Sequence, residues 1–406
     1  MNQEVAVRRR WSSDPVILDT VVPLAIFFLG RLVSAALLTH LAAEAFDPVS
    51  GDRREGATGS SLPGIDYASV ITYWDGAWYE RIAREGYPAN LPRGADGEVI
   101  QNPWAFFPIY PALAGLLMRA GLEFPLAASV ISLVSAAAAM VLLHRLLHPT
   151  LRRFTSLLTV GCLSWGPVSP IFQTAYAESL ALLLILTTFW LVRMGRYGRA
   201  VAAVVVLSLT RPVTAPMAGV MAVLWILRWR NRSDVPFPIA ERRGHATVVV
   251  VAGTSSALWP AVCAVVTGEP DGYALTQQSW LFTERWTPWL FSAASMTDPT
   301  RTLMVLALLG LCVWVAARDE SRAWGTDLRL WVMFNTIFVL AVSQASSSVY
   351  RYLMVGVVLA WPTPEVSQGL KRWQSRAALV TCLLMVMVLL QYGWIRAFYT
   401  SGTLPP

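Results

Sequence analysis

The chain has 406 residues, of which 55% are hydrophobic and 14% charged, and its mean hydropathy is +0.50. One soluble core cannot bury that much apolar surface, so the composition excludes an ordinary soluble protein and indicates a polytopic membrane protein. The net charge of +7 comes from arginine clusters between apolar runs, which is typical of cytoplasmic loops beside anionic lipid and argues against nucleic-acid binding. The single lysine, Lys371, among many arginines indicates a GC-rich genome such as that of an actinobacterium.

The first apolar run, over 16–42, is predicted to be a retained membrane helix. It is too long for the hydrophobic region of a signal peptide, and it contains Arg31. Arg31 and Asp19 lie about three helical turns apart and cannot pair, so Arg31 is expected to contact another helix or a polar cavity. Six basic clusters are expected in the cytoplasm by the positive-inside rule, at 8–10, 144–153, 193–199, 228–243, 318–322 and 371–376.

The apolar runs between these clusters predict an all-α polytopic membrane protein with about eleven crossings in one domain over 1–406. The expected spans lie near 16–42, 124–147, 154–173, 177–193, 199–210, 213–228, 245–267, 301–317, 327–345, 350–363 and 377–395. The apolar segment 104–120 is interrupted by Pro108 and Pro111, which favours an interfacial or re-entrant segment, with a true crossing as the alternative.

Two long segments are then expected on the extracytoplasmic side of the plasma membrane. The first loop, 43–103, is predicted to carry a juxtamembrane helix near 73–86, and the second loop covers 268–299. This topology also places Glu178, Arg211 and Arg351 outside. Acids and arginines of catalytic type therefore gather at one membrane face.

These residue types suit direct transfer of a sugar from a lipid phosphate to an acceptor hydroxyl. The reaction needs one carboxylate to accept the hydroxyl proton and cations to hold the phosphate leaving group. Asp75, in the juxtamembrane helix, is the predicted general base. The spacing Thr72-x-x-Asp75 also matches a helix capping box, and the two roles are compatible. Trp74, Trp78 and Ile82 would form the buried face of that helix, and Trp74 and Tyr79 are expected to contact substrate.

Other polar groups have both a functional and a structural interpretation. Arg211, Arg351 and Tyr350 are predicted to bind the donor phosphate, although each also suits an anchor at the membrane surface. Glu178 is either a substrate contact or a favourable charge at a helix N-terminus. Arg285 lies among tryptophans that suit sugar stacking or an interfacial belt.

No metal site or cofactor is predicted. His144 and His148 have i, i+4 spacing but are expected to have no third ligand nearby, and the four cysteines lie within apolar runs without metal-ligand spacing. An arginine clamp can take the place of a divalent cation on a monophosphate leaving group.

Five short motifs in chain order resemble the GPI mannosyltransferase II (PIG-V-like) family of GT-C-fold glycosyltransferases. They span roughly residues 70 to 215: Trp74-Asp75, then Ile82-Ala83 with Gly86-Tyr87, then Ala105-Phe106-Phe107-Pro108 with Tyr110-Pro111, then Tyr176-Ala177-Glu178-Ser179-Leu180, then Leu209-Thr210-Arg211. The resemblance implies inverting transfer of mannose from a polyprenyl-phosphate donor to a lipid-linked or glycolipid acceptor.

Two other functional classes fit the same composition. In a lipid or glycolipid transporter, Arg31, Glu178 and Arg211 would line a polar pathway. A non-catalytic subunit of a glycosyltransferase complex is the third alternative, and it would not need Asp75. The lack of an evident internal repeat and the gathering of polar groups at one face favour the transferase.

Overall fold

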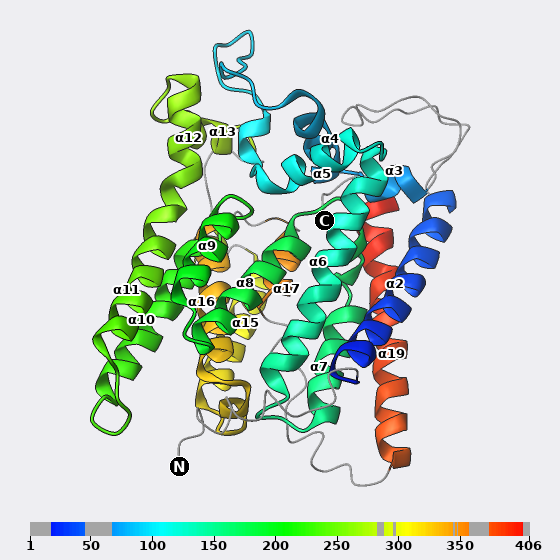
Figure 1. Ribbon diagram of the computed structural model, residues 1–406. Coiled ribbons are helices and arrows are strands. Elements are labelled where there is room, and N and C mark those ends of the chain that lie inside the picture. Colours follow the sequence, from blue (N-terminus) through cyan, green and yellow to red (C-terminus); the bar gives the residue numbers. More distant parts are fainter. Residues whose placement is uncertain are drawn as a thin grey trace.

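The computed structural model describes residues 18–44, 67–281, 288–294, 298–343, 346, 348–356 and 373–400 (Figure 1). Within these ranges the regular secondary structure is helical, and an isolated β-bridge joins Arg93 and Val99. The prediction of an all-helical fold is confirmed.

Most helices stand side by side as a bundle (Figure 1). They are α2 (Leu18–Glu44), α6 (Phe124–Leu147), α7 (Arg153–Trp165), α8 (Glu178–Arg193), α9 (Tyr197–Ser208), α10 (Thr214–Arg230), α11 (Ile239–Thr254), α12 (Leu258–Thr267), α15 (Pro299–Ala317), α16 (Thr326–Val342), α17 (Val349–Met354) and α19 (Trp373–Ile395). Each predicted span contains one of these helices or a part of one.

Within the described residues, five helical stretches are long and apolar enough to cross a membrane. They are Leu18–Leu41, Phe124–Leu147, Ile239–Thr267, Pro299–Ala317 and Trp373–Phe398. The other bundle helices have 17 residues or fewer, so the predicted count of eleven crossings stays a prediction.

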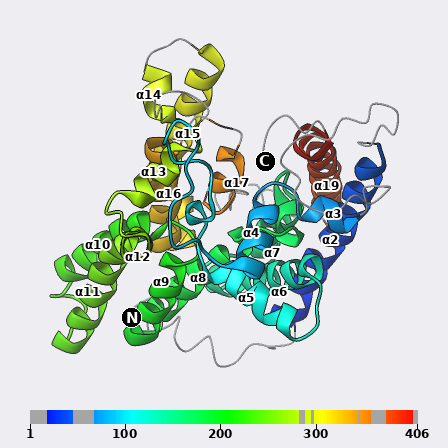
Figure 2. The same cartoon turned by 90° about the horizontal axis from the view of Figure 1, so that it is seen from above.

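The middle of the bundle is apolar and tightly packed, whereas its outer helices expose leucines and valines. Seen from above, α2 and α19 lie on one side and α10 and α11 on the other, with α6 and α8 between them (Figure 2). Outward-facing side chains such as Leu32, Leu303 and Leu389 are 67–69% exposed. Large apolar surfaces of this kind are costly in water and favourable against lipid, as expected of a membrane protein.

Shorter helices cover one end of the bundle, which is the upper end in Figure 1. They are α3 (Tyr67–Ile71), α4 (Asp75–Glu85), α5 (Ile109–Arg119) and α13 (Gly272–Gln278), while α14 (Trp289–Ala294) packs beside α15 and α16. Helix α4 corresponds to the predicted juxtamembrane helix. Helix α5 is the apolar part of 104–120; with 11 residues it is about 16 Å long, half of a hydrocarbon core, so it is too short to cross.

A second apolar cluster attaches α4 and α5 to the bundle. Tyr79 and Ile82 are the buried side chains of α4, and they pack with Phe106 and Tyr110. Trp78 is only partly buried and stacks on Phe106 at 5.8 Å between ring centroids. The predicted buried face of this helix is thus rotated: Tyr79 rather than Trp78 points into the core.

The basic connections lie at the opposite, lower end of the bundle (Figure 1). One ion pair joins three of them, because Arg193 at the end of α8 binds Asp327 at the start of α16 through two nitrogens, at 2.6 Å each. Its Nη1 also donates to the carbonyl of Leu146 at 2.8 Å. The chain therefore separates its basic loops from the end that carries α4 and α5.

Candidate active site

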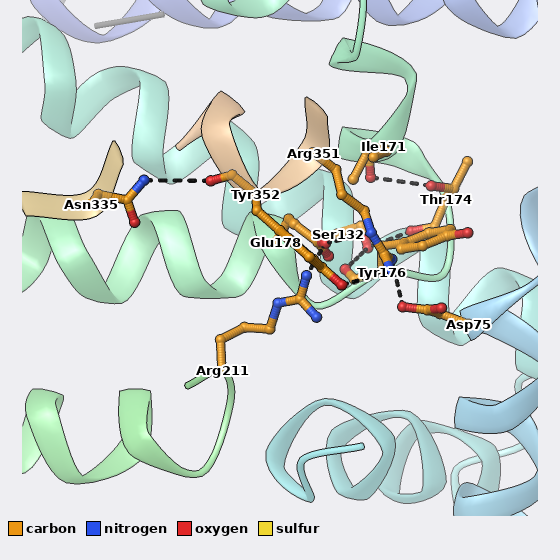
Figure 3. A network of polar contacts seen from close by, with 10 residues as sticks. All are labelled: Asp75, Ser132, Ile171, Thr174, Tyr176, Glu178, Arg211, Asn335, Arg351 and Tyr352. Atoms are coloured by element: carbon orange, nitrogen blue, oxygen red, sulfur yellow. Dashed lines mark hydrogen bonds and ion pairs between the residues drawn. The ribbon is translucent and has the colours of Figure 1, made fainter. Parts of the chain in front are cut away.

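Four charged side chains from distant parts of the chain meet beneath α4 (Figure 3). Arg351 Nη1 donates to Asp75 Oδ2 at 2.5 Å, and Arg351 Nε lies 3.6 Å from Glu178 Oε1. Arg211 Nη2 donates to the same Glu178 oxygen. We call Asp75, Glu178, Arg211 and Arg351 the charged cluster.

Asp75 is the first residue of α4, and its backbone setting is unusual. The preceding residue, Trp74, has φ 59° and is the one described non-glycine residue with positive φ. The Trp74 indole Nε1 donates to the carbonyl of Phe398 at 3.1 Å, and the substrate contact of Trp74 stays a prediction. The predicted capping box is wrong, since the Thr72 hydroxyl donates to the carbonyls of Ala68 and Ser69 and no side chain caps α4. Asp75 is therefore directed to Arg351, and local backbone strain of this kind concentrates at functional sites.

Glu178 is the first residue of α8 and is held by the segment that precedes it. Two serines one turn apart on α6 fix this segment: Ser129 donates to the carbonyl of Gln173 at 3.0 Å, and Ser132 to that of Thr174 at 2.7 Å. The amide of Ala175 donates to the carbonyl of Ile71 at 2.8 Å. This bond joins the start of α8 to the segment that leads into Asp75.

A glycine permits the close approach of these two segments. A Cβ atom added at Gly76 would lie 3.1 Å from the Cβ of Ala175, which is tighter than most such contacts. Because Gly76 follows Asp75 directly, the absence of a side chain here lets the acid come near Glu178.

The two arginines come from a turn and a short helix. Arg211 follows α9, where its amide donates to the carbonyl of Leu207 at 2.9 Å, and the same turn is tied to α5 by Ile109 N donating to Leu209 O at 3.0 Å. Arg351 lies on α17, whose position is supported by Asn335 Nδ2 donating to the carbonyl of Tyr352 at 3.4 Å (Figure 3).

Two tyrosines, Tyr176 and Tyr352, surround the arginines. The guanidinium carbon of Arg351 lies 5.0 Å from the ring centroids of both Tyr176 and Tyr352, and Arg351 Nη2 donates to the Tyr352 hydroxyl at 3.3 Å. The Arg211 guanidinium carbon lies 5.1 Å from the same Tyr352 ring. The signal was present in the sequence, since each tyrosine lies within two residues of a predicted site residue.

The charged cluster is balanced in charge and largely buried. Its two carboxylates and two guanidiniums sum to zero at neutral pH. The side chains of Glu178 and Arg351 are 2% and 4% exposed, whereas those of Asp75 and Arg211 are both 13% exposed. Among the described residues, Glu178 Oε2 and Arg351 Nε are buried without a hydrogen-bond partner. A buried polar atom without a hydrogen bond costs free energy, so these two atoms lower the stability of the cluster.

Tyr79 is buried next to the charged cluster. Burial raises the pKa of its phenol well above the usual range; the charge of Arg211 opposes this, and those of Asp75 and Glu178 reinforce it. Burial would lower the pKa of Arg211, but the Glu178 carboxylate outweighs burial, and the pKa is raised. Tyr79 is thus a neutral hydroxyl and Arg211 a permanent cation.

Two other predicted site residues do not join the charged cluster. Tyr350 is 46% exposed, and its ring centroid lies 6.4 Å from that of Phe398. The α17 tyrosine that contacts both arginines is therefore Tyr352. Arg285 falls within 282–287, outside the described residues.

One group of metal-ligand type occurs at the lower end of the bundle. Asp19 joins His144 and His148, with one potential ligand atom from each residue within 4.8 Å of the others, so the expectation that this pair lacks a third ligand is wrong. These groups have protein partners already: Asp19 pairs with Arg153 at 2.7 Å, and His144 Nδ1 lies 2.8 Å from the Ser156 hydroxyl. Arg31 contacts another segment, as expected, and donates to the carbonyls of Ser164 and Ser169.

No protein-family model and no curated protein matches the chain. Among solved structures, the apo oligosaccharyltransferase of Archaeoglobus fulgidus aligns with a TM-score of 0.51 at 12% identity, covering 95% of this chain and 56% of that one. The same enzyme with an inhibitory peptide and a dolichol-phosphate aligns at 0.47, with 12% identity and coverage of 93% and 56%. The chain thus spans about half the length of this enzyme. The match at 0.51 shows a likeness of fold to this enzyme, in keeping with the all-helical chain and its apolar helices of membrane-spanning length.

Proposed function

We propose that the protein is an inverting membrane glycosyltransferase that moves a mannosyl residue from a polyprenyl-phosphate donor to a lipid-linked or glycolipid acceptor, without a metal ion or other cofactor. The observation that carries this proposal is the charged cluster, in which a partly exposed acid meets two arginines at the end of the bundle opposite to the basic loops. The neighbour that shares the fold is itself an oligosaccharyltransferase.

The cluster contains the groups that a direct displacement needs. The acceptor oxygen bonds to the anomeric carbon while the bond from that carbon to the phosphate oxygen breaks, which inverts the configuration. The acceptor proton passes to Asp75, the general base, and the electron pair of the broken bond remains on the phosphate. Arginine stabilises this anion through charge-assisted hydrogen bonds, and Glu178 and Tyr79 complete the polar wall.

Mannose and the polyprenyl phosphate are proposed from the resemblance to PIG-V-like mannosyltransferases, whose five motifs include Asp75, Glu178 and Arg211. In the fold these three residues come from separate elements and meet at one place. The PIG-V-like family is therefore proposed for this chain on the basis of its motifs and their convergence.

The geometry favours a transferase over the alternative, a lipid or glycolipid transporter. Transporters of known type hold their substrates near the middle of the membrane. Here the charged cluster lies where α4 and α5 cover the bundle, near its upper end (Figure 1). A site at that depth suits a lipid head group that approaches from the membrane surface.

A transfer assay tests the function. Purified protein is incubated with radiolabelled polyprenyl-phosphate-mannose and a membrane lipid extract, and the products are separated. We expect label in a lipid-linked or glycolipid product, with free polyprenyl phosphate released. Turnover of polyprenyl-phosphate-glucose in place of the mannose donor would overturn the sugar, and label that stays on the donor would contradict transfer.

Cysteine labelling tests the proposed plasma-membrane topology, with the active site outside. Ala95→Cys and Ser233→Cys form a matched pair, because both positions are exposed. The connection from α4 to α5 that contains the first lies at the upper end of the bundle, and the connection from α10 to α11 that contains the second lies at the lower end (Figure 1). In a background without the four native cysteines, an impermeant maleimide should label Cys at 95 in intact cells and reach 233 after lysis. The reverse pattern would place the charged cluster in the cytoplasm.

A further inference from the structure

The two arginines of the charged cluster differ in how much of each guanidinium is already used. Arg351 is 4% exposed and is surrounded by protein groups. Its Nη1 donates to Asp75 and its Nη2 to Tyr352, while its Nε is buried 3.6 Å from Glu178 Oε1 without a hydrogen bond. The rings of Tyr176 and Tyr352 lie against it, each with the centroid 5.0 Å from the guanidinium carbon. Because these groups enclose the guanidinium, an incoming phosphate would have to displace one of them to reach it.

Arg211 retains free donor capacity. Its Nη2 pairs with Glu178, while its Nε and Nη1 make no hydrogen bond within the part of the chain that the structure describes. Its side chain is 13% exposed, about three times the value for Arg351. Figure 3 shows Arg211 reaching Glu178 from below, from a different element and on a different side from Asp75. Three N–H bonds of Arg211 are thus available to a ligand.

We infer that the arginines have separate roles: Arg211 binds the donor phosphate, whereas Arg351 is a positioning residue that holds Asp75 and does not contact the phosphate. This inference rests on the proposed function and refines it. A phosphate that binds Arg211 uses N–H groups that make no other hydrogen bond. A phosphate that displaces Asp75 from Arg351 breaks a buried ion pair, which is costly because Asp75 loses its partner. Phosphate binding at Arg211 therefore costs less free energy and leaves Asp75 paired with Arg351 throughout the reaction.

The same arrangement assigns separate tasks to the two oxygens of Asp75. Oδ2 is held by Arg351. Oδ1 accepts no hydrogen bond from any residue that the structure describes, and the Asp75 side chain is partly exposed. Oδ1 is therefore the oxygen that takes the acceptor proton, while the electron pair of the broken sugar–phosphate bond stays on the phosphate at Arg211. Glu178 Oε1 faces both arginines and so fixes the distance between the phosphate site at Arg211 and the acid held by Arg351.

Binding and turnover measured side by side separate the two roles. The probe is a short-chain polyprenyl phosphate in detergent, titrated into wild type, Arg211→Gln and Arg351→Gln. We expect Arg211→Gln to raise the Kd at least tenfold. Arg351→Gln should change the Kd less than threefold while kcat falls at least a hundredfold, and Arg351→Lys should recover part of kcat. Equal losses of phosphate binding in both glutamine variants, or an unchanged Kd in Arg211→Gln, would overturn the division of roles.

Two controls keep the test decisive. Arg351→Gln leaves Asp75 without its partner, so the double variant Asp75→Asn/Arg351→Gln, which removes both charges, is titrated as well. If Arg351 acts through Asp75 alone, the double variant binds polyprenyl phosphate as wild type does, and a tenfold weaker Kd would contradict that. Failure of wild type to bind the probe would instead contradict the proposed function.

Discussion

The two ends of the bundle both contain buried arginine–carboxylate pairs, but they satisfy them differently. At the lower end, Arg193 binds both oxygens of Asp327 at 2.6 Å, and the amide of Leu328 donates to the same carboxylate at 2.9 Å. At the upper end, Arg351 bonds to one oxygen of Asp75, and Glu178 Oε2 has no partner among the described groups.

The difference indicates which pair stabilises the fold and which is adapted for chemistry. A bidentate pair with every polar atom satisfied offers nothing to a substrate and holds three chain segments together. A cluster with unused hydrogen-bond donors and acceptors is less stable, but those donors and acceptors can bind a substrate. Counting ion pairs would treat the two sites alike, whereas the unused atom of Glu178 distinguishes the charged cluster from the pair of Arg193 and Asp327.

The largest expected effect is on turnover, from a change at the upper end. Asp75→Asn keeps the shape and one acceptor oxygen for Arg351 but cannot accept the proton, so transfer should fall about a hundredfold or more. Initial rates with the labelled donor measure this. Because Arg351 keeps Glu178 at 3.6 Å, folding should be disturbed little. Near-normal turnover would show that Asp75 is not the general base. The ion pairs at both ends would then be structural.

The matched change at the lower end should affect stability instead. Asp327→Asn leaves Arg193 without the acid that it binds bidentately, and breaking such a buried pair costs about 3–5 kcal/mol of unfolding free energy. Unfolding by SDS, followed by tryptophan fluorescence, measures the loss. Turnover per folded molecule should stay within twofold of wild type. A loss of turnover as large as that in Asp75→Asn would show that both ends serve catalysis.

The smallest expected effect is that of a chelator. Both acids of the charged cluster are already paired with arginines, and they belong to no group of three potential metal ligands within the described ranges. Transfer should therefore persist in EDTA at a rate within twofold of the untreated enzyme. The control is a metal-dependent glycosyltransferase in the same buffer. If activity disappears with EDTA and returns with manganese or magnesium, a metal ion and not arginine alone holds the phosphate leaving group.

The positions of the helices were predictable because they depend on local sequence. Apolar runs bounded by charged or proline-rich segments give helices near the predicted ends, as in α6 and α8. The brevity of α5 also follows from Pro108 and the basic residue Arg119 that bound it. The rotation of α4 was not predictable: Tyr79 rather than Trp78 is buried because Phe106 and Tyr110 are there to receive it.

The sequence by itself determined the class of protein, its helices and the residue types available for chemistry, because hydropathy and charge patterning act over short stretches of chain. The tertiary structure alone decided which of those residues meet. Arg351 lies 276 positions from Asp75, and nothing local to either segment specifies that they pair. It also decided that Tyr352 and not Tyr350 touches the arginines, and that Asp19 lies beside His144. Long-range contacts arise from packing among many helices, and a local sequence pattern does not specify that packing.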